Sequence, residues 1–253
     1  MSSENPHDTL KDVPSIVDYN QEVVKQGFKG DGHKVKIAVI SSGNPDHEII
    51  NTGKPIIFSN SDYGKDTIGQ STIMGGILIA NSENLKGMIP KASVSFLKVS
   101  NNDDNVNISS LISAMLWSII KKVDIISLPI SISEDFPDFA ETIKKAFANN
   151  ICVICDSGLV GGTDSYPAKY PETLSVGTLN HSKELFKTSL SGRVNVLGTS
   201  MLTTYIGNKY IFASGGACSV AYATGLMALL IAENNFKNTP DELYAELETR
   251  LKV

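Results

Sequence analysis

The stretch SGGACSVAYATG, residues 214–225, has the composition of a turn that could hold a catalytic nucleophile. Two glycines lead into small residues, and the apolar run VAYATGLMALLIA follows. A tight turn at a helix N-terminus is a frequent mount for an attacking hydroxyl or thiol. The place where a hydroxyl would be expected is filled by Ala217, which has no nucleophilic atom, and Cys218 follows it. The stretch therefore indicates either a nucleophile site without its nucleophile or a site that uses the neighbouring thiol.

A reactive Cys218 would need a base, and the chain has four histidines: His7, His33, His47 and His181. Of these we expect only His47, in the loop NPDHE after the first predicted strand, to lie near such a site. The pair Cys152 and Cys155 has the spacing of a metal or redox pair. However, ICVIC is typical of a buried strand, on which residues three apart point to opposite faces. We therefore predict core cysteines there and no metal site.

Two glycine-rich loops, SGLVGG (157–162) and SGGACS (214–219), could in principle cradle a phosphate. Neither has the full spacing of a dinucleotide or P-loop fingerprint. A nucleotide-binding module is therefore a weaker hypothesis, and we expect no cofactor.

The composition limits the partners. The 253 residues have a net charge of −5 and no cluster of lysine and arginine, which argues against nucleic acid as the main partner. The N-terminus, MSSENPHDTLKDV, is polar and unlike a secretory signal. The longest apolar run is short and rich in small residues, which disfavours a membrane span. We expect a cytoplasmic protein that binds neither nucleic acid nor membrane.

Strand and helix signals alternate along the chain. Strands are predicted at 34–40, 93–100, 123–130, 151–156 and 173–179, and helices at 72–80, 108–122, 137–150, 219–234 and 239–251. This alternation predicts an α/β fold with a mostly parallel sheet and helices on both faces. In such a sheet, functional loops lie at the carboxyl ends of the strands. We predict an N-terminal arm at 1–30 and a single domain at 31–253.

Seven segments, in a fixed order, resemble the subtilisin-like serine proteases. They are VKIAVISSG, GQSTIMGGILIA, KGMIPKASVSFLKV, VDIISLPIS, NNICVICDSG, YPAKYPETLSVGTLN and SGGACSVAYATGLMALL. The resemblance runs from about residue 13 to the C-terminus and is greatest to intracellular subtilisins. It implies a three-layer subtilisin-like fold with a cis bond between Tyr166 and Pro167. The loop NSENLKG is shorter than the calcium loop of the family, so we expect no metal there.

The chain departs from the family pattern at the chemical positions. Ser41 stands for the catalytic Asp, Gln70 for the His, Ala217 for the nucleophilic Ser and Leu159 for the oxyanion Asn. A hydroxyl nucleophile, an imidazole base and an orienting carboxylate are all needed for this chemistry. The resemblance therefore implies a pseudoprotease that binds a peptide or an active protease partner, alone or as an oligomer. The alternative is a peptidase with displaced chemistry at Cys218 and Asp156.

The resemblance also implies a peptide-binding groove whose two edges flank the former active site. Its residues are Ser100, Asn101 and Asn102 on one edge, Pro129, Ile130, Ser131 and Ile132 on the other, and Asp156, Ser157 and Gly158 at the specificity pocket. Pro129 removes a backbone donor, and Ser131 and Ile132 replace glycines of the family. An open groove and a narrowed one are equally compatible with the sequence. Asp156 is expected either to cap its own loop or to select a basic side chain.

Overall fold

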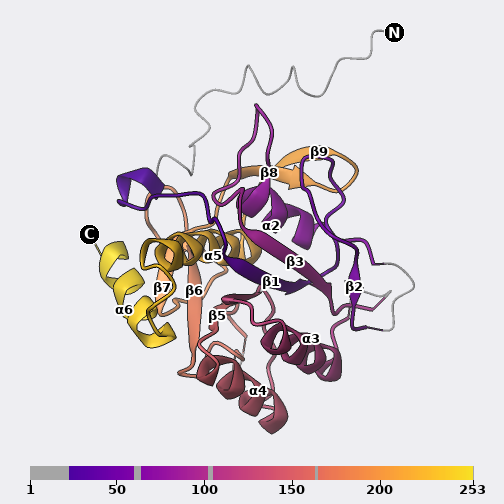
Figure 1. Ribbon diagram of the computed structural model, residues 1–253, viewed down its shortest axis with the longest axis vertical. Helices are drawn as coiled ribbons and strands as arrows, with labels where there is room; N and C mark the ends of the chain where they lie inside the picture. Colours follow the sequence, from indigo (N-terminus) through magenta and orange to yellow (C-terminus); the bar gives the residue numbers. More distant parts are fainter. Residues whose placement is uncertain (1–22, 60–63, 102–104, 163–164, 253) are drawn as a thin grey trace.

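The computed structural model describes residues 23–59, 64–101, 105–162 and 165–252. A seven-stranded, fully parallel sheet crosses the molecule in the order β2-β3-β1-β4-β5-β6-β7 (Figure 1). Its strands are β1 (Lys36–Ser41), β2 (Ile56–Ile57), β3 (Ser93–Lys98), β4 (Ile125–Leu128), β5 (Cys152–Asp156), β6 (Thr173–Leu179) and β7 (Val194–Leu197). A separate antiparallel pair is formed by β8 (Met201–Tyr205) and β9 (Lys209–Ala213).

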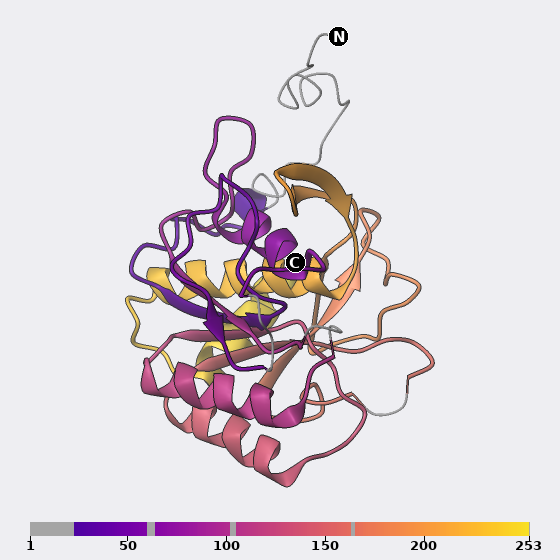
Figure 2. The same ribbon diagram turned by 90° about the vertical axis from the view of Figure 1, so that its right-hand side faces the viewer.

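Helices cover both faces of the sheet. Figure 2 shows the three layers, with α3 (Ile108–Ile120) and α4 (Pro137–Ala148) on one side. The other side is covered by α2 (Gln70–Ile79), α5 (Gly216–Glu233) and α6 (Pro240–Leu251). The predicted α/β fold with a parallel sheet is therefore confirmed, and its layers agree with the subtilisin-like fold that the resemblance implies.

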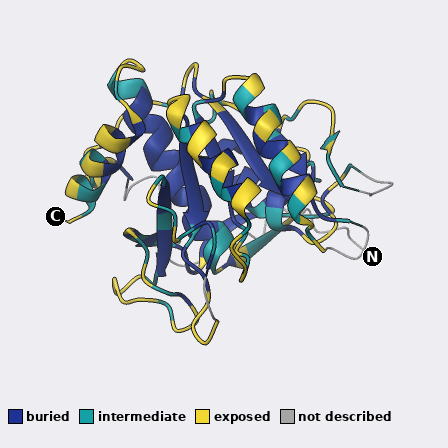
Figure 3. Cartoon of the chain, turned by 90° about the horizontal axis from the view of Figure 1, so that it is seen from below, coloured by how far each residue is buried: buried dark blue, intermediate teal, exposed yellow. Residues whose placement is uncertain are grey.

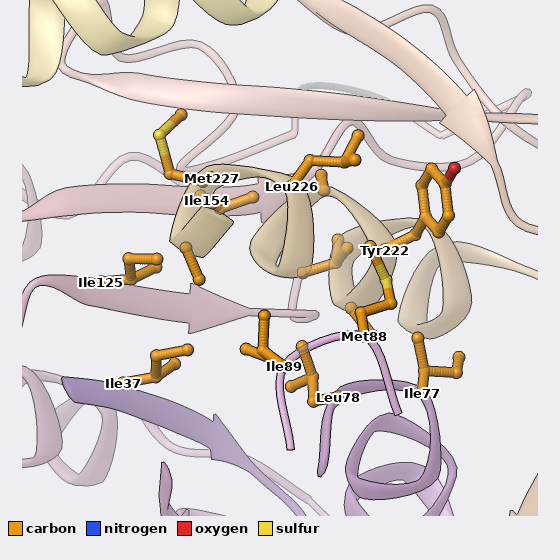
Figure 4. Close-up of a cluster of buried hydrophobic side chains, with 14 of the residues drawn as sticks. Ile37, Ile77, Leu78, Met88, Ile89, Ile125, Ile154, Tyr222, Leu226 and Met227 are labelled. Carbon is orange, nitrogen blue, oxygen red and sulfur yellow. The ribbon is translucent and has the colours of Figure 1, made fainter. Parts of the chain in front are cut away.

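The larger core cluster lies between the sheet and α5. Figure 4 shows Tyr222, Leu226 and Met227 of α5 in one buried cluster with Ile37, Ile125 and Ile154 of the strands. By length and hydropathy α5 could cross a membrane, contrary to the expectation from the sequence, yet 78% of its apolar window is buried inside the protein. The apolar run of α5 is thus used as the central helix of this core.

The second core cluster lies under α3 and α4, whose outer faces are exposed in the view from below (Figure 3). Strand β5 separates the two clusters. Cys152 and Ile154 belong to the α5 side, whereas Val153 and Cys155 belong to the α3–α4 side. Both cysteines are fully buried, as predicted from the alternation of side chains along a strand.

Three strands of the C-terminal half and the short β2 are additions to the predicted elements. The β8–β9 turn has Gly207 at φ 70° and Asn208 at φ 59°, backbone values typical of a tight hairpin. The predicted arm ends in residues that pack on the domain. Val23 and Phe28 are buried in the α5 core cluster, and the Lys29 N–H donates to Glu233 Oε1 at 2.8 Å.

Candidate functional site

The carboxyl end of β1 is a topological switch point. Strands β3 and β4 pair with β1 on opposite sides. The chain after β1 therefore builds one side of the sheet with β2 and β3, and then crosses to the other side to continue with β4. In open α/β sheets, ligands bind in the crevice at such a point, outside the carboxyl ends of the strands. Ser41 is the last residue of β1, Gln70 is the first of α2, and Pro129 directly follows β4. Hydrogen bonds join these three residues at this end of the sheet.

A hydrogen-bonded chain links the three residues. Ser41 Oγ donates to Gln70 Oε1 at 2.6 Å, and Gln70 Nε2 donates to the Pro129 carbonyl at 3.2 Å. Ser41 is 1% exposed, so its hydroxyl depends on Gln70 for an acceptor. Ser41 and Gln70, the predicted counterparts of the catalytic Asp and His, therefore lie side by side, and a hydrogen bond from the Ser41 hydroxyl to the Gln70 amide oxygen joins them.

A buried carboxylate fixes the start of α2. Asp66 accepts hydrogen bonds from the Gly69 N–H at 2.9 Å, from the Thr72 N–H at 2.7 Å and from Thr72 Oγ1 at 2.7 Å. It also accepts from Ser42 Oγ at 2.8 Å. An acceptor is needed here because the first N–H groups of a helix have no partner within the helix. Asp66 thereby holds Gln70 at a defined position, and the sequence analysis did not identify this role.

Helix α5 brings Ala217 to the same end of the sheet. The helix packs against α2, and its N-cap, Gly215, has φ 124°, a backbone angle that favours glycine. The Gly215 N–H donates to the Gly198 carbonyl at 2.8 Å, which ties the turn to the end of β7. Ala217 follows as a partly buried residue of the first turn of α5. The turn and the helix that the sequence predicts are both present, and Ala217 lies in the first turn of the helix.

The structure argues against the reactive thiol that the sequence suggested at Cys218. Cys218 is 1% exposed and belongs to the α5 core cluster. Burial raises the pKa of its thiol to about 12, so the nucleophilic thiolate is scarce near neutral pH. His47, the expected base, packs edge-to-face on Tyr210 with ring centroids 5.0 Å apart. The structure therefore places Cys218 in the core, which counts against the displaced thiol mechanism.

Asp156, the last residue of β5, lies directly against the start of α5. A Cβ atom at Gly216 would lie 2.6 Å from Asp156 Oδ2, so only glycine leaves room for this carboxylate. Desolvation by burial raises the pKa of Asp156, and the backbone N–H groups of Gly158 and Ser157 oppose the rise. The sequence analysis missed the contact with Gly216, which joins residues 60 positions apart.

The predicted oxyanion position is an exposed aliphatic residue. Leu159 is 62% exposed and bridges to Ser189, while the next residue, Val160, donates its N–H to the Thr188 carbonyl at 3.0 Å. Ser157 is buried, and its Oγ donates to the Leu190 carbonyl at 2.6 Å. Gly158 has φ 98°, which suits glycine. The loop is thus fixed by hydrogen bonds of its backbone and of Ser157, and it exposes the side chain of Leu159.

One predicted edge of the groove is partly occupied by the chain itself. Ile132 pairs with Tyr166 through two backbone hydrogen bonds of 2.9 and 2.8 Å. Ser131 is exposed, and its Oγ accepts from Ser165 Oγ at 3.1 Å. The Pro129 carbonyl is already taken by Gln70. Ile130 and Ser131 are therefore the part of this edge with the fewest backbone contacts to neighbouring segments, and the expected cis Tyr166–Pro167 bond is confirmed.

The other predicted edge of the groove, at Ser100 and Asn101, also forms hydrogen bonds within the chain. Ser100 is buried, and its carbonyl accepts a hydrogen bond from Ser59 Oγ at 2.5 Å. Ser100 also forms an isolated antiparallel β-bridge with Val106. The Asn101 N–H donates to the Asn105 carbonyl at 2.8 Å. Asn102 lies outside the described residues. This edge is therefore a closed turn at Ser100 and Asn101.

Among the residues that the structure describes, no group of three or more His, Cys, Asp or Glu side chains could hold a metal ion. The chemistry that the described site offers is hydrogen bonding by Ser41 and Gln70 and negative charge at Asp156.

Comparison with known proteins identifies the family. A model of the subtilase family matches residues 32–251. The chain is 32% identical over 244 residues to an intracellular serine protease of Paenibacillus polymyxa, with 87% of this chain and 74% of that protein covered. It is 30% identical over 256 residues to the major intracellular serine protease of Bacillus subtilis strain 168, with 90% and 79% covered.

A third relative, the minor extracellular protease Epr of Bacillus subtilis strain 168, is 28% identical over 218 residues. The match covers 82% of this chain but only 34% of that longer protein. The family match extends over most of the chain and over the whole crevice that holds Ser41, Gln70 and Ala217. The chain therefore belongs to the subtilase family.

Proposed function

We propose that this chain is a catalytically inactive subtilase that acts by binding a peptide or a protein partner. The observation that carries the proposal is the pairing of Ser41 with Gln70 at the carboxyl end of β1, in a chain that has Ala217 in the first turn of α5. A hydroxyl and an amide are joined where the family mechanism needs a carboxylate and an imidazole. Neither Ser41 nor Gln70 exchanges a proton near neutral pH, so the pair supplies no base.

The expected loss of activity is large. In subtilisin, removal of the nucleophile or the base lowers turnover by about 10⁶-fold. Loss of an oxyanion donor lowers it by about 10²–10³-fold. Here Ala217 offers no attacking atom and the side chain of Leu159 offers no hydrogen bond. Peptide hydrolysis by the family mechanism is therefore expected to be undetectable.

The alternative enzyme, with displaced chemistry at Cys218 and Asp156, has weaker support. Cys218 is a core residue with a raised pKa, and the Asp156 carboxylate is packed against Gly216. Alkylation by iodoacetamide distinguishes the two proposals, because a catalytic thiol reacts in the native state. We expect the native protein to react at least about 100-fold more slowly than the urea-unfolded protein, since burial suppresses the thiolate.

A binding role uses what the site retains. Ser131 is exposed at the groove edge, Ile130 is partly buried, and Asp156 is a partly buried carboxyl group at the end of the neighbouring strand β5. An added peptide strand at this short edge, with a basic side chain near Asp156, is the binding mode that these features favour. The partner would be a precursor peptide or an active protease of the same, cytoplasmic compartment, in which this chain serves as a regulatory or scaffold subunit.

The test is restoration of the missing groups on the retained mount. We expect purified wild-type protein to leave a fluorogenic peptide uncleaved. The variant with Ser41→Asp, Gln70→His, Leu159→Asn and Ala217→Ser should gain measurable hydrolysis. The matched control has the first three changes and keeps Ala217. Hydrolysis by the wild type that co-purifies with the protein would refute the proposal, and its loss in Cys218→Ala or Asp156→Ala would assign it to the alternative enzyme.

Binding is tested by recovery of partners from the native cells with tagged protein, read by mass spectrometry. Wild type and Asp156→Ala are compared side by side. A peptide or protease that is enriched by the wild type and lost in Asp156→Ala would support the groove as the binding site. Equal recovery by both proteins would place the partner elsewhere on the surface.

A further inference from the structure

A cavity of about 620 Å³ lies at the β7 end of the sheet, away from the crevice at β1. It is bounded by Lys25 and Gln26, the carboxyl ends of β6 and β7, the residues that follow β6, and the end of α6. Its floor is apolar and consists of Leu179, Val196, Leu197 and Leu251. A cavity of this size with apolar walls is typical of a binding site for a small ligand.

The rim of the cavity is basic. Lys25, His181, Lys183 and Arg250 line it, and no Asp or Glu is among the lining residues. The charge of Arg250 is already balanced, because its guanidinium pairs with Glu233 at 2.9 Å and with Glu246 at 2.6 Å. Lys183 is exposed and forms no ion pair within the described part of the chain. The rim therefore favours an anionic group on the ligand, close to Lys183.

Gln26 supplies a second polar feature. Its Oε1 atom is buried and accepts no hydrogen bond from any described group, and its side chain lines the cavity. A buried acceptor without a donor is destabilising, so a ligand with an N–H group would satisfy it. A simple fatty acid has a carboxylate and an apolar chain but lacks this donor.

Strand β7 lies beside the cavity and ends the sheet. It pairs with β6 on one side and with no other strand of the described chain on the other. Asn195, Val196 and Leu197 of this edge strand line the cavity. An unpaired strand edge is a common docking line for an extended peptide.

We propose that this cavity binds the apolar C-terminal end of a peptide. The terminal carboxylate lies at Lys183, the last amide N–H donates to Gln26 Oε1, and the terminal apolar side chain covers Leu179 and Val196. All three parts of the ligand match a described feature of the cavity. This site is separate from the groove at Pro129–Ile132 and does not depend on the proposed loss of catalysis.

The test measures binding of a fluorescein-labelled Gly-Ser-Ile-Leu peptide with a free C-terminal carboxylate, by fluorescence anisotropy. The comparison ligands are the same peptide with a C-terminal amide and unlabelled decanoate as competitor. Lys183→Gln is expected to weaken binding by about 1.5-fold to fivefold, the range for an exposed ion pair. Gln26→Leu should weaken it by about fivefold or more, since the hydrogen-bond partner is lost.

Lys144→Gln is the matched control, because Lys144 is an exposed lysine of α4 on the opposite face of the sheet. Thermal unfolding of each variant confirms that it is folded. Weaker binding of the amide peptide, together with the two variant effects, supports the proposal. Equal affinity for the acid and amide peptides would overturn it. So would the absence of saturable binding, or saturable binding of decanoate that the peptide does not displace, which would assign the cavity to a fatty acid.

Discussion

The hydroxyl of Ser41 and the amide of Gln70 are 2.6 Å apart and hold the end of β1 against the start of α2. This contact connects the sheet to a helix of the opposing layer at the switch point of the fold. Because Gln70 also donates to the Pro129 carbonyl, one side chain joins β1, α2 and the segment after β4. The two hydrogen bonds that join these three residues are both between neutral groups, so neither bond should depend on pH near neutrality.

The first prediction concerns this pair. Gln70→Ala leaves the buried Ser41 hydroxyl without its acceptor, and we expect a loss of about 1–3 kcal/mol of unfolding free energy. Ser41→Ala in the same background should restore part of this loss, because the orphaned donor is then absent. A double-mutant cycle measured by urea unfolding gives the coupling, expected at about 1 kcal/mol. Strict additivity of the two substitutions would contradict the role assigned to the hydrogen bond.

The second prediction concerns Gly216 and Asp156. Gly216→Ala places a Cβ atom within 2.6 Å of the Asp156 carboxylate, and the resulting overpacking is expected to destabilise the protein by about 1–3 kcal/mol. In the Asp156→Ala background the same change should be neutral or stabilising, since alanine is favoured over glycine in a helix. Urea unfolding of the four proteins tests this reversal. A destabilising Gly216→Ala in both backgrounds would show that the carboxylate is not the obstacle.

The third prediction concerns pH. Desolvation raises the folded-state pKa of Asp156 above its unfolded value. The folded state therefore binds the proton more tightly, and stability from this group is present at low pH and lost as pH rises through the folded pKa. Asp156→Asn removes the ionisation, so the unfolding free energy of the variant relative to that of the wild type should rise between about pH 4 and about pH 7. Urea unfolding of both proteins at these two pH values measures the difference. A pH-independent difference would contradict the assignment.

Most of the fold was predictable from the sequence because its helices and central strands have strong hydrophobic periodicity. Strand β6 matches its predicted range of 173–179, and α3, α4 and α6 begin at or next to the predicted residues. The β8–β9 hairpin and β7 were not predicted. Their short runs, such as VNVL in β7, alternate too briefly to distinguish a strand from a loop, and the sheet determines them through pairing.

The site was predictable only in its residue types. Ser41 and Gln70 lie together as the resemblance implied, because chain order fixes the ends of β1 and α2. The backbone pairing of Ile132 with Tyr166 and the packing of Asp156 on Gly216 were not predictable. Both contacts join segments far apart in the chain and depend on distances below 3 Å. The residue pattern of a single segment does not determine which distant segment it will contact. These two contacts are therefore known only from the folded structure.

The fourth prediction concerns Asp66, which organises the whole start of α2. The residue is 4% exposed, and its carboxylate accepts from the backbone of Gly69 and Thr72 and from two hydroxyl groups. Asp66→Ala leaves these buried donors without an acceptor, so we expect a loss of about 3 kcal/mol or more in unfolding free energy. Asp46→Ala is the matched control, since it removes a carboxylate paired with Lys65 at the surface.

The Asp46→Ala control should lose about 1–2 kcal/mol, since it removes a surface ion pair and one acceptor of the Gly207 N–H at 3.3 Å. Asp66→Asn separates charge from hydrogen bonding, because the amide keeps one acceptor oxygen and adds a donor that meets the donors already present. We therefore expect Asp66→Asn to lie between the wild type and Asp66→Ala in urea unfolding. If Asp66→Ala were no more destabilising than Asp46→Ala, α2 would be held by its packing against α5 and β8 alone, and the position of Gln70 would not depend on this cap.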